Sequence, residues 1–314
     1  MKKSFIFPGQ GSQTVGMVKE FYDNFKVARE TLEIVNDSLK KDLSKIMFEG
    51  PESDLTDTEN AQPAIMAGSM VILNVLENET GKKINELCDF VAGHSLGEYS
   101  ALCASEAINL NDTAKLLRVR GKAFSDIGKI SKGSMVALVG ATIEQAQEVV
   151  EKSRLDGEIC QIANDNTVGQ VVLSGNVNSI DKAVEVATSM NIKRAIKLSV
   201  SGAFHSKLME PAITEMEKAL NDVNINNPFV PVIANYTANI SDKNNIKENL
   251  LKQITGTVRC RETMLFMEKE GCEMFIEIGN GKVLSNMVPR TCSNVKAFAI
   301  NSIESMNNFI KEFI

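Results

Sequence analysis

One serine stands in a segment whose spacing is typical of a catalytic nucleophile. Residues 93–97 read Gly-His-Ser-Leu-Gly, which is the Gly-x-Ser-x-Gly pattern of a nucleophile elbow centred on Ser95. A short apolar segment of strand length, residues 90–92, precedes this pattern, and residues 98–104 are typical of a packed helix. A turn between strand and helix places the serine at the start of a helix, where free N–H groups and the helix dipole stabilise a developing oxyanion. The pattern therefore predicts that Ser95 is a nucleophile.

The histidine count identifies a candidate base. The chain has only two histidines, and a serine nucleophile usually needs an imidazole to remove its proton. His94 is adjacent to Ser95, so in an extended or turn backbone its side chain points away from the serine. His205 is therefore the predicted base, by elimination. Without the elbow, a single histidine would more often be an ordinary core or surface residue.

Two arginines on one predicted helix have different surroundings. The helix is expected over residues 112–128 with Asn111 as its N-cap. Arg118 shares a face with two lysines and is expected on a solvated stripe, whereas Arg120 lies beside leucines, an alanine and a phenylalanine. A cation directed at an apolar face needs an anionic partner. That partner is either an internal carboxylate or a ligand, and the residues alone leave both open.

The bulk properties indicate a globular protein and exclude several classes. A chain of 314 residues with 43% hydrophobic residues suits one large domain with an insertion, or two domains. The net charge of −6 argues against general affinity for nucleic acid or anionic membranes. The six cysteines form no Cys-x-x-Cys pair and no cluster with histidine, which predicts neither a metal site nor a disulfide framework. The first apolar run stops at Pro8, too short for a signal peptide, and no stretch could span a bilayer. We therefore expect a cytoplasmic protein with reduced thiols.

The order of predicted elements indicates an α/β protein with a smaller inserted unit. From about residue 132 the elements follow a βαββαβ order, which is ferredoxin-like. The inserted unit has expected strands at 134–139, 158–163, 170–174 and 192–200, and helices at 143–153 and 177–190. Outside it we expect strands at 4–7, 90–92, 230–235 and 274–278, and helices at 17–22, 26–39, 62–77, 209–221, 247–254 and from 282. His205 follows the inserted unit directly, at a seam of the kind where ligand sites concentrate.

Several motifs, taken together and in this order, carry a family resemblance. They occupy residues 7–13, 93–98, 120–121, 169–175, 202–206 and 277–284. The chain resembles, over essentially its whole length, the malonyl-CoA:acyl-carrier-protein transacylases of fatty-acid synthesis and the related acyltransferase domains of polyketide synthases. The resemblance implies an α/β-hydrolase-like core with a parallel sheet, formed by residues 1–131 and 199–314. Residues 132–198 would form the inserted ferredoxin-like subdomain.

The resemblance also implies roles for individual residues. Ser95 would be acylated, His205 would act first as general base and then as general acid, and Arg120 would bind the malonyl carboxylate. The backbone N–H groups of Gln10 and Leu96 would form the oxyanion hole.

A further implied feature is that a backbone carbonyl, rather than an aspartate, orients the histidine. The matching carbonyl in this chain is expected at Arg259. The surrounding segment departs from the family pattern, with Thr257 and Cys260 standing where proline and tryptophan are usual.

The implied reaction is a ping-pong transfer of malonyl from malonyl-CoA to the phosphopantetheine thiol of acyl carrier protein, supplying fatty-acid synthesis without a cofactor. The expected partners are the coenzyme A thioester and the acyl carrier protein, with no nucleic acid and no membrane. The acidic carrier needs a positive surface, and four cations lie near the seam in sequence: Lys193, Arg194, Lys197 and Lys207. The alternatives are a free-standing acyltransferase of a polyketide synthase, a serine thioesterase or esterase, and a catalytically silent docking protein.

Overall fold

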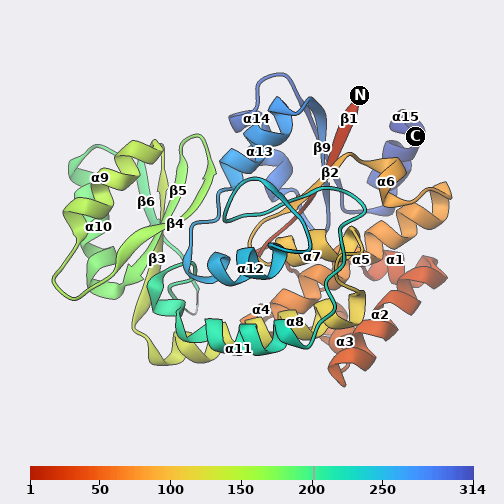
Figure 1. Cartoon of the computed structure of the whole chain (residues 1–314), viewed down its shortest axis with the longest axis horizontal. Coiled ribbons are helices and arrows are strands. Elements are labelled where there is room, and N and C mark those ends of the chain that lie inside the picture. Colours follow the sequence, from red (N-terminus) through yellow and green to blue (C-terminus); the bar gives the residue numbers. More distant parts are fainter. Residues whose placement is uncertain (201) are drawn as a thin grey trace.

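A six-stranded sheet forms the centre of the larger part of the molecule, in the order β10-β9-β1-β2-β7-β8 (Figure 1). The computed structural model describes residues 1–200 and 202–314. The strands are β1 Lys2–Phe7, β2 Phe90–Gly93, β7 Val232–Ile233, β8 Ile240–Ser241, β9 Cys272–Ile278 and β10 Lys296–Ile300. All neighbouring pairs are parallel except β7 and β8. Strands of a parallel sheet are covered on both faces and therefore read as continuous apolar runs, as Phe5, Ile6 and Phe7 do in β1.

Helices surround this sheet and bury its faces. They are α1 Lys19–Asn24, α2 Lys26–Leu39, α3 Leu43–Glu49, α4 Glu52–Thr56, α5 Thr58–Thr80, α6 Ile84–Leu87, α7 Gly97–Ala104, α8 Leu110–Ile130, α11 Pro211–Asn221, α12 Ile246–Thr255, α13 Cys260–Lys269, α14 Val283–Thr291 and α15 Ile303–Phe313. Residues 60–73 of α5 are all buried, which makes this helix part of the core rather than a cover. No helix in the described part of the chain is both long and apolar enough to cross a bilayer.

A second sheet, antiparallel and four-stranded, has the order β4-β5-β3-β6. Its elements are β3 Gly133–Val139, α9 Ile143–Ser153, β4 Cys160–Thr167, β5 Gln170–Asn176, α10 Val177–Ser189 and β6 Arg194–Lys197. Figure 1 shows this unit at the left, with α9 and α10 on its outer side. The βαββαβ order confirms the predicted fold class, an α/β core that carries a ferredoxin-like unit.

Two helices begin earlier than predicted. The N-cap of α8 is Asn109 and not Asn111, because the Asn109 side chain accepts the N–H of Asp112 at 2.9 Å. The helix α5 was predicted to open at Gln62–Pro63, but it starts at Thr58 with Pro63 inside it. The elements α3, α4, α6, α15, β8 and β10 were not predicted.

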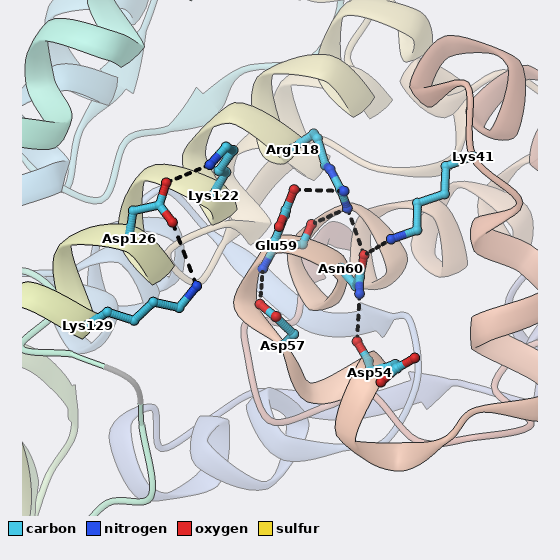
Figure 2. A network of polar contacts seen from close by, with 9 residues as sticks. All are labelled: Lys41, Asp54, Asp57, Glu59, Asn60, Arg118, Lys122, Asp126 and Lys129. Carbon is cyan, nitrogen blue, oxygen red and sulfur yellow. Dashed lines mark hydrogen bonds and ion pairs between the residues drawn. The ribbon is translucent and has the colours of Figure 1, made fainter.

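Arg118 explains in part how α5 accommodates its proline, and Figure 2 shows Arg118 with its partners Glu59 and Asn60. Pro63 has no N–H for the carbonyl of Glu59, four residues earlier, and Arg118 Nη1 donates to that carbonyl at 3.3 Å instead. Arg118 also pairs with the Glu59 carboxylate at 2.7 Å and donates to the side chain of Asn60 at 2.7 Å. Its side chain is only 27% exposed, so the expectation of a solvated Arg118 is wrong.

The same polar network ties three elements together. Lys41, just after α2, donates to Asn60 Oδ1 at 2.9 Å, and Asn60 Nδ2 donates to the carbonyl of Asp54 in α4 at 2.8 Å. The salt bridges of Asp126 to Lys122 and Lys129 lie farther along α8, on an exposed surface (Figure 2). The network fixes the first turn of α5 against α8, the two helices that supply Gln62 and Arg120 to the site below.

The carboxyl ends of the parallel strands meet at one edge of the larger sheet. The loop after β1, the turn after β2, the segment after β7 and the turn after β9 therefore all lie at this edge. In open α/β sheets this edge is where ligands bind.

Candidate active site

The turn after β2 is a strained nucleophile elbow. Ser95 has φ of 54°, a left-handed conformation that is unfavourable for a residue with a side chain. The two positions of the motif occupied by glycine have no room for a side chain. A β-carbon on Gly93 would lie 1.9 Å from the carbonyl oxygen of Gly97, and one on Gly97 would lie 2.3 Å from that of Phe7. Only glycine at both positions lets the turn close this tightly against β1.

The structure brings the predicted nucleophile and base into contact. Ser95 Oγ lies 2.8 Å from Nε2 of His205. His205 is 3% exposed and also has a positive φ, 57°. Its Nδ1 lies 2.8 Å from the carbonyl oxygen of Gln253. Because a carbonyl can only accept, Nδ1 carries the proton and Nε2 is left to accept the Ser95 hydroxyl proton.

The carbonyl that orients His205 is that of Gln253, and the prediction of Arg259 is wrong. Gln253 lies in the last turn of α12, where carbonyls have no helical donor and can accept from other groups. The Arg259 carbonyl instead accepts the N–H of Thr263 at 2.9 Å, at the start of α13. The guanidinium of Arg259 pairs with Glu262.

His205 is neutral in this environment. Burial, together with the positive charge of Arg120, lowers the pKa of His205 to about 3. A neutral imidazole can accept a proton at neutral pH, so it can serve as a base.

Arg120 is a buried cation beside the nucleophile. It is 1% exposed, and its Nη2 donates to Ser95 Oγ and to Gln253 Oε1, both at 3.0 Å. Its Nη1 donates to Gln62 Oε1 at 2.8 Å, and the ring of Phe124 lies 4.3 Å from the guanidinium carbon.

No carboxylate in the described part of the chain lies within salt-bridge distance of Arg120, and its buried Nε has no hydrogen-bond partner there. A buried charge without a direct counterion is costly unless a ligand supplies one. The sequence left two partners open for Arg120, an internal carboxylate or a ligand. The structure favours the ligand.

The predicted oxyanion-hole donors lie on two segments that pack together, and both N–H groups are free in the described part of the chain. The loop after β1 packs on the elbow, since a β-carbon on Gly9 would lie 2.7 Å from the carbonyl oxygen of His94. Within residues 1–200 and 202–314, the N–H groups of Gln10 and Leu96 have no protein acceptor, whereas the N–H of Ser95 is bound by Asn235 Oδ1 at 2.8 Å. The residue after the nucleophile is the usual donor in such elbows.

A cavity of about 380 Å³ joins these groups. Gln10, Ser95, Arg120 and His205 all line it, and its apolar wall includes Phe204 and Leu284. Met135 and Ala137 of β3 line it as well, so the cavity lies between the two sheets. Its size and its mostly apolar lining with a few convergent polar groups are typical of a small-molecule site.

Sequence reasoning missed a set of amide side chains around the catalytic pair. They are Gln62, Gln161, Asn235 and Gln253. Gln161 of β4 donates to the carbonyl of His205 at 3.2 Å and to that of Thr255 at 2.9 Å, which links the smaller sheet to the base. Successive amides separated by 18 to 99 residues give no spacing signal, and only their burial on otherwise apolar faces could have pointed to them.

His94 behaves as expected. Its Nε2 lies 2.7 Å from Asn166 Oδ1, away from the Ser95 hydroxyl. Among the described residues, no group of His, Cys, Asp and Glu side chains could hold a metal ion.

Comparisons with known proteins agree with the motifs. A family model described as the acyl transferase domain matches residues 4–312. The chain is 39% identical over 306 residues to a malonyl CoA-acyl carrier protein transacylase of Bacillus subtilis, covering 97% of this chain and 95% of that protein. It is similar to the crystal structure of an acyl-carrier-protein-S-malonyltransferase from Bartonella henselae, with a TM-score of 0.95, 44% identity and 99% of each chain covered. It is also similar to a malonyl-transacylase in complex with a type II PKS acyl-carrier protein, with a TM-score of 0.93, 31% identity and 99% of each chain covered.

Proposed function

The chain belongs to the acyl transferase family, and we propose that it transfers malonyl from malonyl-CoA to the phosphopantetheine thiol of acyl carrier protein, supplying fatty-acid synthesis. The observation that carries the proposal is the position of Arg120, a buried cation with no carboxylate within salt-bridge distance among the described residues, whose Nη2 lies 3.0 Å from the Ser95 hydroxyl oxygen. A malonyl thioester has a free carboxylate close to its reacting carbonyl. One molecule can therefore place its carboxylate on Arg120 and its thioester on Ser95.

The first half-reaction forms an acyl-enzyme. His205 Nε2 takes the proton of Ser95 as the oxygen attacks the thioester carbonyl. The N–H groups of Gln10 and Leu96 stabilise the oxyanion, and loss of one such donor typically costs about 3 kcal/mol. When the tetrahedral intermediate collapses, the carbon–sulfur bond breaks and coenzyme A leaves with the proton from His205. The malonyl group stays on Ser95 as an ester.

The second half-reaction runs the same steps with another thiol. The pantetheine thiol of the carrier gives its proton to His205 and attacks the ester carbonyl. Collapse of this intermediate breaks the bond to Ser95, and His205 returns the proton to the serine oxygen. The steps use only side chains and backbone N–H groups of this chain and its two substrates, and we propose no cofactor.

The carrier is proposed to dock near the seam of the two sheets. Lys193, Arg194, Lys197 and Lys207 are all exposed, and Lys197 pairs with Asp181. A second candidate function, transfer to a polyketide synthase carrier, is favoured by the similarity to the transacylase in complex with such a carrier. Comparing kcat/KM for carriers of the two types distinguishes these functions.

Intact mass spectrometry tests the proposal. Incubation with malonyl-CoA should add one malonyl group to the protein, and holo acyl carrier protein should then remove it and gain the same mass. Ser95→Ala should show no adduct. Release of free malonate faster than transfer, or rapid hydrolysis of p-nitrophenyl esters, would identify a thioesterase or esterase instead. If the wild type forms no adduct, the remaining interpretation is a catalytically silent docking protein.

Two further expectations remain proposals. We propose that residues 132–198 form a subdomain, which is supported by a separate apolar cluster whose members all lie between Val136 and Ala195. We also propose a cytoplasmic location, since all six cysteines are free thiols, as suits a reducing compartment.

A further inference from the structure

Asn235 contacts the nucleophile elbow with both polar atoms of its side chain. Its Oδ1 accepts the N–H of Ser95 at 2.8 Å, and its Nδ2 donates to the carbonyl of Gly93 at 2.6 Å. The residue is 1% exposed. The two bonds hold the two peptide groups that immediately precede the strained residue Ser95.

The sheet places Asn235 at this point. Strand β7 runs parallel to β2, with Val232 beside Val91 and Ile233 beside Ala92. Two residues beyond Ile233, Asn235 is therefore level with the elbow that follows β2.

The backbone of Asn235 is itself held at both ends. Its N–H donates to the carboxylate of Glu98 at 3.0 Å, and its carbonyl accepts the N–H of Arg259 at 3.1 Å. Glu98 lies in α7, which starts at the elbow, and Arg259 is the N-cap of α13. The side chain therefore reaches the elbow from a fixed base rather than from a mobile loop.

We propose that Asn235 is a positioning residue for the acylation of Ser95. A residue held at φ of 54° tends to relax toward the ordinary region unless its surroundings oppose this. Asn235 opposes it by fixing the two peptide groups that lead into Ser95, which limits rotation about the Ser95 N–Cα bond. It also occupies the N–H of Ser95, so that the next N–H along the chain, that of Leu96, is the one left without a protein acceptor among the described residues.

This inference rests on the proposed acyl transfer, in which Ser95 Oγ must meet both His205 Nε2 and the thioester carbon. Positional errors of about 1 Å can cost about 100-fold in rate. Binding of malonyl-CoA depends on Arg120 and the cavity, which Asn235 does not contact in the described structure. The rate of acylation and the affinity should therefore respond differently when Asn235 is changed.

The experiment compares Asn235→Ala and Asn235→Asp with the wild type. Single-turnover acylation by malonyl-CoA is followed by quenched intact mass, and malonyl-CoA affinity is measured by calorimetry in a Ser95→Ala background. We expect acylation to be slower by about 100-fold for Asn235→Ala and at least about tenfold for Asn235→Asp, with Kd changed less than about threefold. The Asp variant keeps an acceptor for Ser95 N–H but sets an oxygen against the Gly93 carbonyl. Because Asp is nearly isosteric with Asn, this variant still tests the proposal if the Ala variant fails to fold.

The matched control is Asn36→Ala. The Asn36 side chain likewise holds backbone N–H groups of a following turn, those of Leu43 at 2.9 Å and Ser44 at 3.2 Å, far from the cavity. This control should lose stability and keep the wild-type acylation rate per folded molecule. Wild-type acylation by Asn235→Asp, or a Kd that weakens in parallel with the rate, would overturn the positioning role. A wild type that forms no malonyl adduct would overturn the proposed function instead.

Discussion

The Nδ1 proton of His205 is accepted by the backbone carbonyl of Gln253, at 2.8 Å, in the place where many serine hydrolases have a carboxylate. A neutral carbonyl fixes the tautomer and the ring orientation, as an aspartate does. It offers no full negative charge to an imidazolium. His205 is therefore held by hydrogen-bond geometry and kept deprotonated by burial, without a charged partner.

The first prediction is that no carboxylate behaves as a triad acid. Glu98 is a buried carboxylate in contact with Gln253, and it accepts from Gln253 Nε2 at 2.7 Å. Glu98→Gln keeps an oxygen acceptor for that bond, so kcat/KM for malonyl-CoA should fall by less than about tenfold. Replacement of the aspartate of a serine protease costs about 10⁴-fold. A loss of that size in a folded Glu98→Gln protein would mean that a carboxylate assists the base.

The second prediction concerns the pH profile of acylation. Burial lowers the pKa of His205 to about 3, so the base stays deprotonated well below pH 6.5. The rate should decline only when pH approaches the lowered pKa, because protonation of Nε2 abolishes the base. kcat/KM in the Glu98→Gln background, which removes a second titrating group, should be flat between pH 8 and about pH 5. An acid limb centred near pH 6.5 would contradict the neutral, buried imidazole.

The third prediction is a pH-dependent difference in stability. Burial raises the pKa of Glu98 from 4.5 to about 7, so between these values the folded state binds more protons than the unfolded state. The contribution of Glu98 to the free energy of unfolding therefore falls as pH rises, by up to about 1.4 kcal/mol per pH unit. Glu98→Gln should be more stable relative to wild type at pH 8 than at pH 5. Urea unfolding at the two pH values measures this, and an equal difference at both would contradict it.

The fourth prediction separates the two histidines. Ser95→Ala should abolish the malonyl adduct, and His205→Ala should slow its formation by about 10²–10⁴-fold, the usual range for lost acid–base catalysis. His94→Ala should cost less, because His94 contacts Asn166 and not the serine hydroxyl. Rates of adduct formation from quenched mass spectra give the order directly. A greater loss for His94→Ala than for His205→Ala would reverse the assignment of the base.

The sequence predicted those parts of the site that depend on local pattern. Ser95 is identified by its elbow, His205 by the scarcity of histidine and Arg120 by its apolar helical face. The orienting carbonyl could not be found this way, because every residue has one and its availability depends on where α12 ends. Asn235 was missed for a related reason, since its position depends on the pairing of β7 with β2 across more than 130 residues.

The fold was predicted in the same uneven manner. The helices α2 and α9 begin and end where their apolar spacing predicts. The start of α5 was misplaced because Pro63 resembles a first-turn proline, while a distant Arg118 compensates for the hydrogen bond that it removes. A compensation by a residue 55 positions away leaves no local signal.

The last prediction concerns Arg120 and the choice of acyl group. Malonyl and acetyl thioesters differ by one carboxylate, and Arg120 is the buried cation that faces the nucleophile. A guanidinium can hold a carboxylate through two parallel hydrogen bonds, which an ammonium cannot reproduce. Removing one partner of a buried ion pair costs about 3–5 kcal/mol, so Arg120→Ala should lower kcat/KM for malonyl-CoA by about 10²–10³ or more.

Acetyl-CoA loses no such contact in Arg120→Ala, and its kcat/KM should hold or rise, because no carboxylate is needed and a buried charge is gone. Two controls lie on the same helix. Lys122→Ala removes only an exposed pair with Asp126 and should leave both rates and the melting temperature near wild type. Arg118→Ala should leave both rates near wild type per folded molecule but lower the melting temperature, since it breaks the half-buried contacts to Glu59 and Asn60. Steady-state kinetics with both thioesters decide the matter: equal losses for malonyl and acetyl in Arg120→Ala would show an arginine that supports the fold and does not select the substrate.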